Sequence, residues 1–484
     1  MATAFNLVRN TRVFFTTNVG LVSGVSNAVL ATGLTTSNTV ELQVLDGFSF
    51  KQGTQTAAVQ LNEAGATPVR GQRNFNTSLD PVDFSFSTYL RPALVSTKAT
   101  AEEKVLWNAL MGVNPIDTGI TIGGTVTGIS RTTSSTATAT IAGTSMTYAG
   151  AVVGDYITVG GATGASGVAF EWDQPAKIIS LSGTAIVIEY VSAPSVAAGT
   201  TTSLGTLKFY KGAWTEHAAV APTASYALTS FAGSNLNQLQ AFGIIFVVDG
   251  AVFVVDNCAM DQSVIDFGLD AISMAAWTGK GTQLRQLNST EASLAGSTFS
   301  GTALAGTSAA KNTSANYITN KLSTVTLQSN IAGVGGIAYT IALTGGSITF
   351  ANGINYITPA NLGVVNSAIG YFTGTRAISG SLNAYLKTGT NTTATLLKDI
   401  LAGSSSATDT KYRLQVEIGG AANATRVEIE MDGAMLQVPT TETADIISTV
   451  IGFTAQSTTT NSSGTGVDYD LQNTNDAVIR YFSA

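Results

Sequence analysis

Apolar and polar residues alternate along many short stretches of this chain, as they do in strands that bury one face. Clear examples are residues 40–45, 411–418 and 425–431. Asp432-Gly433 follows the last of these, and Asp249-Gly250 splits the apolar segment 241–255. An Asp-Gly pair between apolar runs predicts a tight hairpin turn at both places. The pattern therefore predicts a mainly β protein.

One alternating stretch occurs twice. Residues 85–92 read SFSTYLRP and residues 381–388 read SLNAYLKT, so that Tyr89 and Tyr385 lie 296 residues apart. A predicted amphipathic helix follows each copy, the first with a Thr100–Glu103 capping box. The apolar faces expected for the two helices are Val105, Leu106, Ala109 and Leu110 in one, and Leu396, Leu397, Ile400 and Leu401 in the other. Residues 269–279 and 444–455 then match at a spacing near 175. Matches in the same order indicate a duplicated domain.

The fall in spacing means that the first copy carries about 115 extra residues, expected near 116–222. Short Thr, Val and Ile runs separated by glycine fill this range and predict an inserted Ig-like or small-barrel β domain on an exposed loop. The whole chain is then divided as follows: a first domain of residues 1–115 and 223–290, the insert 116–222, a linker 291–316, a second domain 317–457 and a C-terminal arm 458–484.

Charge is scarce in this chain. Charged residues make up 11% of the sequence, and the net charge is −7. No block of Lys and Arg is available to neutralise phosphates, so tight nucleic-acid binding is not expected, although a weakly acidic wall would let DNA slide past. The N-terminus lacks the pattern of a signal peptide, and each arm of 241–255 is too short to span a bilayer. A chain made in the cytoplasm, without a membrane segment, is expected.

The search for catalytic groups yields no candidate site. His217 is the single histidine and Cys258 the single cysteine, which is too few for the usual zinc or Cys–His sites. Glu102 and Glu103 are expected in the first turn of a helix, where carboxylates suit the dipole. The spacing of Asp256, Asp261, Asp266 and Asp270 is not that of an EF-hand loop. We therefore expect no catalytic residue, no cofactor, no metal and no enzymatic activity.

Several longer stretches resemble tail tube proteins of long-tailed bacteriophages (siphophage type). They are residues 7–17, 61–92, 317–327, 343–363, 380–389 and 436–446. The likeness is greatest to the kind in which one chain carries two fused tube domains and forms trimers. It implies two tandem tail-tube-type β-sandwich or barrel domains, each with a flanking α-helix, plus the inserted small β domain. The insert and the terminal arm lie outside the resemblance.

The resemblance also implies a function. A major tail tube subunit forms stacked trimeric, pseudo-hexameric rings around a channel that conducts genome DNA into the host. Its partners would be further copies of itself and other tail proteins such as the tape measure, the terminator and the baseplate or hub. The chain would be made in the host cytoplasm and end in the virion, and the insert would contact a host or environmental surface.

The polar loop 62–76 is the candidate for contacts between rings or subunits. Its candidate residues are Glu63, Arg70, Arg73 and Asn74. An ordinary exposed hairpin loop is the alternative interpretation of this segment. For the whole chain, the alternatives are another tail component, such as a distal tail or hub protein, and a β-rich carbohydrate-binding adhesin.

Overall fold

The structure is a computed structural model, and it describes twenty-six stretches of the chain and two single residues. The described residues are 11–20, 22–23, 29–30, 38–45, 47–59, 73–95, 98–111, 118–131, 138–149, 151, 153, 156–162, 175–190, 199–201, 204–211, 214–216, 225–230, 239–248, 251–286, 317–329, 337–362, 365–404, 412–419, 425–442, 446–456, 458–460, 467–469 and 476–483. The predicted linker 291–316 lies outside them.

The first copy is a sandwich of antiparallel strands with one short helix. Its elements are β1 (Thr11–Thr16), β4 (Thr39–Leu42), β5 (Ser49–Val59), β6 (Arg73–Tyr89), β7 (Pro92–Val95), β8 (Lys98–Ala101), α1 (Lys104–Met111), β18 (Phe242–Val248), β19 (Ala251–Gly268), β20 (Met274–Gly281) and β21 (Gln283–Gln286). The pairings run β4–β1–β18–β19–β20–β6–β5. Val248 stands opposite Ala251, which confirms the hairpin predicted at Asp249-Gly250.

The second copy repeats this plan. Its elements are η4 (a 3₁₀ turn, Asn320–Leu322), β22 (Thr324–Ser329), β23 (Ala338–Thr340), β24 (Ala342–Ala351), β25 (Asn355–Ile357), β26 (Gly370–Phe372), β27 (Ala377–Tyr385), α4 (Thr393–Ser404), β28 (Tyr412–Gly419), β29 (Arg426–Leu436), β30 (Thr440–Glu442) and β31 (Ser448–Ala455). The pairings run β23–β22–β28–β29–β31–β27–β24. Two halves with the same pairing order in the same chain order are two copies of one fold.

The matched tyrosines occupy equivalent places in the two copies. Tyr89 ends β6 opposite Met274, and Tyr385 ends β27 opposite Ser448. Ser85 and Ser381, four residues earlier, stand opposite Ser49 and Ser347 respectively. The repeated stretches 85–92 and 381–388 therefore begin in the same strand of the same sheet in each half.

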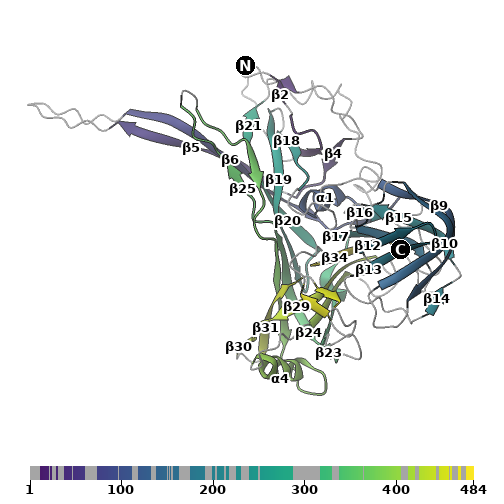
Figure 1. Cartoon of the computed structure of the whole chain (residues 1–484). Coiled ribbons are helices and arrows are strands. Elements are labelled where there is room, and N and C mark those ends of the chain that lie inside the picture. Colours follow the sequence, from purple (N-terminus) through teal and green to yellow (C-terminus); the bar gives the residue numbers. More distant parts are fainter. Residues whose placement is uncertain are drawn as a thin grey trace, which may run out of the picture.

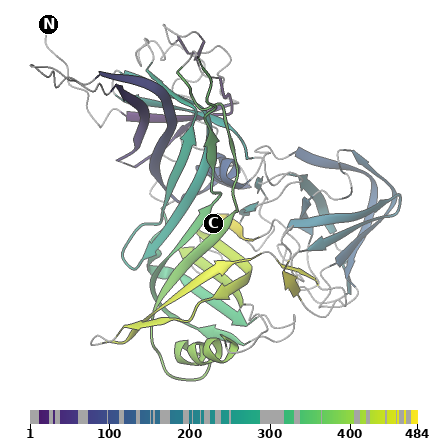
Figure 2. The ribbon, with the colours of Figure 1, turned by 60° about the vertical axis from the view of Figure 1, so that its left-hand side comes forward.

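The segment between helix α1 and strand β16 (Trp214–Glu216) forms a separate sheet. Its strands are β9 (Thr118–Arg131), β10 (Thr138–Ala149), β11 (Tyr156–Ala162), β12 (Pro175–Ser182), β13 (Ala185–Tyr190), β14 (Gly199–Thr201) and β15 (Leu204–Lys211). The pairings β9–β10–β13–β12–β11–β15–β9 close on themselves, so these six strands form a small barrel, and β14 adds to β9. The barrel lies to one side of the main sheets (Figures 1 and 2).

Further strands join the main sheet from the borders of the insert and from the C-terminus. They are β16 (Trp214–Glu216), β17 (Ser225–Ser230) and β34 (Val478–Ser483). β34 pairs with β29 and with β17, and β17 pairs with β16. The predicted insert range thus includes a strand, β16, that pairs with the main sheet. Two further small hairpins are β2 (Val22–Ser23) with β3 (Val29–Leu30), and β32 (Thr458–Thr460) with β33 (Val467–Tyr469).

Helix α1 lies in the core between the two copies. All its residues from Val105 to Met111 are buried, whereas the sequence predicted one buried face. The Trp107 ring packs edge-on against Trp277 of the first copy and Phe350 of the second, at centroid distances of 4.8 and 5.5 Å. The Asn352 side-chain amide of the second copy donates to the Leu110 carbonyl at 2.8 Å. Helix α1 is therefore shared by both copies.

Three details of the local predictions are wrong. Thr100 does not cap the helix, because residues Lys98–Ala101 form β8 and α1 begins only at Lys104. Helix α4 buries Leu396 and Ile400, but Leu401 of its predicted apolar face is exposed. Asp432-Gly433 closes no hairpin, because β29 runs through it and passes there from β28 to β31.

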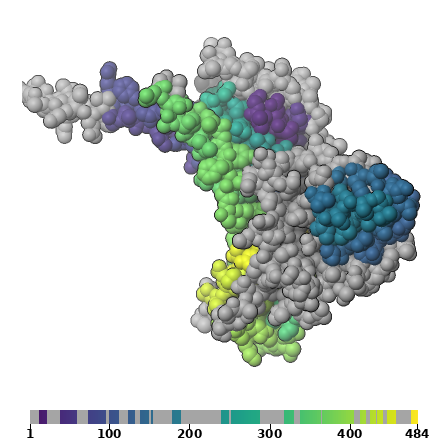
Figure 3. Space-filling view, in the orientation of Figure 1, coloured from purple at the N-terminus to yellow at the C-terminus, as the bar shows by residue number. Residues whose placement is uncertain are grey.

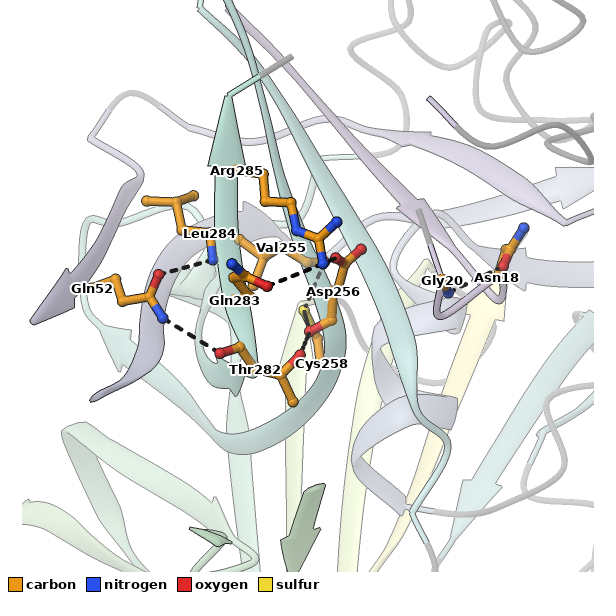
Figure 4. Close-up of polar contacts among 10 residues, drawn as sticks. All are labelled: Asn18, Gly20, Gln52, Val255, Asp256, Cys258, Thr282, Gln283, Leu284 and Arg285. Carbon is orange, nitrogen blue, oxygen red and sulfur yellow. Dashed lines mark hydrogen bonds and ion pairs between the residues drawn. The ribbon is translucent and has the colours of Figure 1, made fainter. Parts of the chain in front are cut away.

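The long strand β19 of the first copy passes from one layer of the sandwich to the other, as β29 does in the second copy. It pairs with β18 up to Cys258 and with β20 from Ala259, and Asn257 at this corner has a positive φ of 44°. Polar contacts tie the corner to its neighbours (Figure 4): Thr282 donates from its N–H to the Asp256 carbonyl at 3.0 Å, and Arg285 lies 3.3 Å from the Asp256 carboxylate. One strand thus contributes to both layers of the sandwich.

Candidate functional surface

One layer of the sandwich is a continuous sheet that runs through both copies. Its strand order is β5–β6–β20–β19–β24–β27–β31–β30, which gives eight strands, four from each copy. The copies join where Gln262–Gly268 of β19 pairs antiparallel with residues 345–351 of β24. Backbone hydrogen bonding therefore continues across the junction as it does within each copy.

The two faces of this sheet differ sharply, because alternate side chains of a strand point to opposite sides. In β6, Val82, Phe84 and Phe86 are buried in the sandwich core, while Asp83 and Ser85 between them are partly exposed on the other face. The core face packs against α1, on the side of the inserted barrel (Figure 1). The other face, called the open face, carries described side chains that are partly or fully exposed.

Small polar and small apolar side chains cover the open face. Hydroxyl and amide groups on it include Ser49, Ser85, Gln262, Thr278, Ser347, Thr349, Ser379, Ser381, Asn383, Thr440 and Ser448. Neighbouring strands link some of them, as the Ser49 and Ser85 hydroxyls lie 2.8 Å apart. Such groups are neutral, so this face holds little fixed charge.

The charges that the described part of this face carries are mixed in sign. Lys51, Asp83 and Lys280 stand side by side across β5, β6 and β20, with Lys51 and Asp83 3.7 Å apart. Asp266 stands nearer the other end of the strands. Two cations on either side of a carboxylate form no cluster that would hold a phosphate backbone. The described charges of this face are therefore not concentrated in either sign.

The continuous sheet has two open edges. Among the described residues, β5 pairs with β6 alone, and β30 pairs with β31 alone. Both edge strands are at the ends of the copies: β5 belongs to the first and β30 to the second. An unpaired strand edge is a template for pairing with another chain.

A second-copy hairpin lies along the first copy. This hairpin, β25–β26, extends from the end of β24 and β27 and runs up to the base of the β5–β6 hairpin (Figure 3). The Tyr356 hydroxyl lies 2.8 Å from both the Asn257 and the Lys280 carbonyl and shares its one proton between them, and the Tyr371 hydroxyl donates to the Leu239 carbonyl at 2.8 Å. At its far end, the Leu79 N–H of β6 donates to the Asn366 carbonyl at 2.7 Å. These contacts fix the hairpin on the first copy.

The predicted contact residues are only partly within the described structure. Glu63 and Arg70 lie outside the described residues, as does His217. Arg73 and Asn74 are exposed at the start of β6, opposite Val59 and Ala58. This puts them on the β5–β6 hairpin, which projects from the body of the molecule (Figure 1).

The four aspartates singled out in the sequence are not brought together. Asp256 pairs with Arg285, and the Asp261 carboxylate accepts a hydrogen bond from the Ile354 N–H at 2.8 Å. Asp266 stands five residues further along the same strand, which is roughly 17 Å away. In the described part of the chain, no group of three or more His, Cys, Asp or Glu side chains is placed to hold a metal ion.

Glu102 and Glu103 do not serve the helix dipole as expected. Both are buried just before α1, and Glu102 lies 3.1 Å from the guanidinium of the buried Arg91. Burial raises the pKa of Glu103 to about 7, although hydrogen bonds from Tyr481 and from the Arg91 N–H act in the opposite direction. Tyr481 also accepts a 2.6 Å hydrogen bond from Trp107. This cluster joins the first copy to the C-terminal strand.

The chain is 23% identical over 461 residues to the tail tube protein pb6 of Escherichia phage T5. The match covers 93% of this chain and 73% of that protein. This chain is a relative of a phage tail tube protein. Its mainly β fold, with large antiparallel sheets, agrees with that relationship. No protein-family profile matches the chain.

The relationship supports a structural role in a phage tail tube and a place in the virion. No helix among the described residues is long and apolar enough to cross a membrane. A tail tube is a structural assembly, so the features that matter are the open face and the two edges rather than a pocket.

Sequence reasoning missed the surfaces that the structure displays most clearly. Alternation in β6 already separated the open face from the core face, but it could not show which strands would share that face. Edge strand β30 is only three residues long and follows Pro439, so its pattern carried no signal. The β25–β26 hairpin was recognisable only as part of the wider resemblance.

Proposed function

We propose that three chains close into a ring in which the open face lines a central channel for DNA. The observation that carries this proposal is the junction between β19 and β24, which joins the two copies edge to edge within one chain. The same two kinds of edge are left open at β30 and β5. If each chain joins the next as the copies join internally, the sheet continues from chain to chain until it closes.

The internal junction supplies a residue-by-residue template for this contact. Asp266 stands opposite Met274, and Glu442 opposite Ser448, at equivalent positions beside the matched tyrosine strands. Ser347 and Ser49 are equivalent in the same way. Because Asp266 pairs with Ser347 at the junction, Glu442 is expected opposite Ser49 of the next chain.

The next pair in the register follows from the same argument. Val264 stands opposite Thr349 at the junction, and their equivalents are Thr440 and Lys51. Lys51 then lies diagonal to Glu442 on the open face, which favours this register because opposite charges on one face of adjacent strands attract.

Three chains of eight strands give a barrel of about 24 strands. At ~4.8 Å between strands and a tilt of ~40°, its backbone radius is roughly 24 Å. Side chains leave a bore on the order of 40 Å, which admits duplex DNA. The mixed, sparse charge of the open face favours passage over binding.

The remaining parts of the proposal concern partners. Rings stack into a tube whose length other tail proteins set, namely a tape measure, a terminator and a baseplate or hub, because head-to-tail stacking alone is open-ended. The β5–β6 hairpin, with Arg73 and Asn74 and the predicted Glu63 and Arg70, contacts a neighbouring ring or subunit. The inserted barrel stands on the outside and meets a host or environmental surface. The chain is made in the host cytoplasm.

Negative-stain electron microscopy of the purified full-length chain tests the proposal. Threefold rings or hollow tubes with a bore on the order of 40 Å are expected. A chain that stays monomeric at high concentration and does not enter tails would contradict it. Deletion of the barrel strands, residues 118–211, serves as a second arm, since it leaves β16 in the main sheet and a peripheral domain is expected to be dispensable for ring formation.

A further inference from the structure

Strand β34 occupies a place that the first copy fills with the residues directly after β20. In the first copy, β21 follows β20 after a single residue, Thr282, and pairs with β19. In the second copy, β31 ends at Ala455, but the strand in the equivalent place beside β29 is β34, which begins only at Val478. The turns after β20 and β31 correspond, because the N–H groups of Thr282 and Gln456 both donate to the strand that passes between the layers. The second copy therefore takes this strand from the end of the chain.

Strand β34 also connects the second copy to the first. It pairs with β29 along one edge and, along the other, with β17 of the first copy from Ser225 to Ser230. It also lies against β7 and β8, and the Tyr481 hydroxyl accepts a 2.6 Å hydrogen bond from Trp107 of α1. The layer opposite the continuous sheet therefore also runs from one copy onto the other.

Buried charges hold β34 in register on β29. The Arg480 guanidinium lies 2.6 Å from Glu428 and also contacts Glu430, and the three side chains are only 4 to 7% exposed. The guanidinium of Arg426, on β29, lies over the Phe482 ring at 3.7 Å. Removing one member of a buried ion pair leaves an uncompensated charge, so a strand held in this way does not detach or shift easily.

The equivalent edge in the first copy carries no such connection within the described part of the chain, where β21 pairs with β19 alone. The other edge of β21 meets the Gln52 side chain of β5, which accepts a hydrogen bond from the Leu284 N–H at 3.1 Å and donates to the Thr282 carbonyl at 3.4 Å (Figure 4). In the proposed ring, this edge faces the preceding chain as β34 faces the first copy. The described strands therefore connect the copies twice within a chain, but only once at the proposed junction between chains.

We propose that β34 acts as a brace between β17 and β29 that fixes the angle between the two copies. The β19–β24 junction alone is one line of backbone pairing, and the angle between adjacent strands of a sheet varies over roughly 10–35°. A second line of pairing in the other layer, about 10 Å away, removes this freedom. The consequence for ring size rests on the proposed function: a fixed angle within every chain restricts closure to a single number of chains.

The angle is tested by the distance between two spin labels, at Thr17→Cys in the first copy and Lys398→Cys in the second. Both positions are exposed, and native Cys258 is buried. The variant Arg480→Glu places a third carboxylate against the two buried glutamates and is expected to detach β34. It is expected to broaden the pulsed-EPR distance distribution of the dilute chain about twofold, because the junction can then take its full range of angles.

Arg413→Glu is the matched control. Arg413 pairs with the same Glu430, but it lies on β28, inside the second copy. Its distance distribution is expected to stay as narrow as that of the unsubstituted chain, and equal widths for Arg480→Glu and Arg413→Glu would overturn the inference. Arg480→Gln removes the charge without adding a repulsive one, so it keeps the test decisive if Arg480→Glu does not fold. A distribution for Arg480→Gln as narrow as in the unsubstituted chain would again overturn the inference.

Native mass spectrometry of the unlabelled chains tests the consequence for ring size. Trimers are expected from the native chain and from Arg413→Glu, and a mixture of trimers with other oligomers is expected from Arg480→Glu. Adding Ser230→Cys and Val478→Cys, which are directly opposed on β17 and β34, should restore trimers under oxidising conditions only. Trimers alone from Arg480→Glu, or no rescue by the oxidised cysteine pair, would overturn the inference. A native chain that forms no ring would contradict the proposed function, while the label distances would still decide whether β34 fixes the angle.

Discussion

Arg91 and Lys387 occupy the same position in the two copies, two residues after the matched tyrosines, yet their surroundings differ. Arg91 is buried, lies 3.1 Å from Glu102, and stacks over the Tyr317 ring at 4.5 Å. Lys387 is exposed. Tyr317 opens the second copy, so Arg91 sits where one copy meets the next. The position after the matched tyrosine strand is therefore buried in the copy that is followed by a second copy within the chain.

The two helices show the same contrast. Helix α1 contacts both copies and is buried on every side from Val105 onward. Helix α4 packs near β23, where the Tyr339 hydroxyl donates to Asp399 at 2.7 Å, and it leaves Leu401 exposed. Equivalent stretches of sequence have thus acquired different roles: α1 fastens the copies together, whereas α4 covers one end of the sandwich.

The largest expected effect comes from removing Arg91, the buried member of this pair of equivalent residues. Arg91→Ala leaves Glu102 buried without its cation and is expected to lower the free energy of unfolding by about 3–5 kcal/mol. Lys387→Ala, at the exposed equivalent position, is expected to change it by about 0.5 kcal/mol or less. Urea unfolding of both variants measures the difference. Equal effects would show that burial at the junction does not distinguish the two positions.

Glu103 predicts a dependence of stability on pH. Its pKa is raised by burial from 4.5 to about 7, so folding favours the protonated form. The stability that this provides is complete below about pH 4.5 and is lost as pH rises to about 7, by on the order of 3 kcal/mol. Glu103→Gln is expected to remove this fall. An unchanged slope between those pH values in the variant, measured by urea unfolding at each pH, would refute the assignment.

The contacts of helix α1 can be weakened by a substitution that leaves no large cavity in the core. Trp107→Phe keeps an aromatic ring but removes the N–H that donates to Tyr481, and it is expected to cost about 1–3 kcal/mol. Leu401→Ala in α4, on an exposed surface, is expected to cost about 0.5 kcal/mol or less. Thermal unfolding of the pair sharpens the contrast between the two helices. A larger loss from Leu401→Ala would contradict it.

The smallest effect is expected on the open face. Lys51 and Asp83 are 3.7 Å apart but well exposed, so Lys51→Ser should leave the unfolding midpoint unchanged. Its effect would instead show as slower ring formation at low salt, since Lys51 is expected beside Glu442 of the next chain. A marked loss of monomer stability would mean that Lys51 has a structural role within the chain.

The alternation of apolar and polar residues and the repeated sequence motifs were enough to predict a duplicated, mainly β chain with a helix in each copy. The pattern around Tyr89 and Tyr385 worked because one face of that strand is buried in both copies. Prediction failed where burial comes from a distant segment. Glu102 and Glu103 resemble the start of a helix, but Tyr481, nearly four hundred residues later in the chain, hydrogen-bonds to the buried Glu103. Asp432-Gly433 resembles a turn, but the strand bends there between two layers.

Closure of the proposed ring requires each chain to repeat its internal β19–β24 junction with its neighbours. A Ser49→Cys/Glu442→Cys double variant tests this directly, since native Cys258 is buried. Directly opposed residues of antiparallel strands lie within disulfide reach, at roughly 4.5–5.5 Å between Cα atoms. Mild oxidation is expected to give a covalent trimer and no larger species on a non-reducing gel. A Gln52→Cys/Glu442→Cys control, whose cysteines point to opposite faces, should stay monomeric. Equal cross-linking of the control, or a ladder that continues beyond three chains, would contradict the claim.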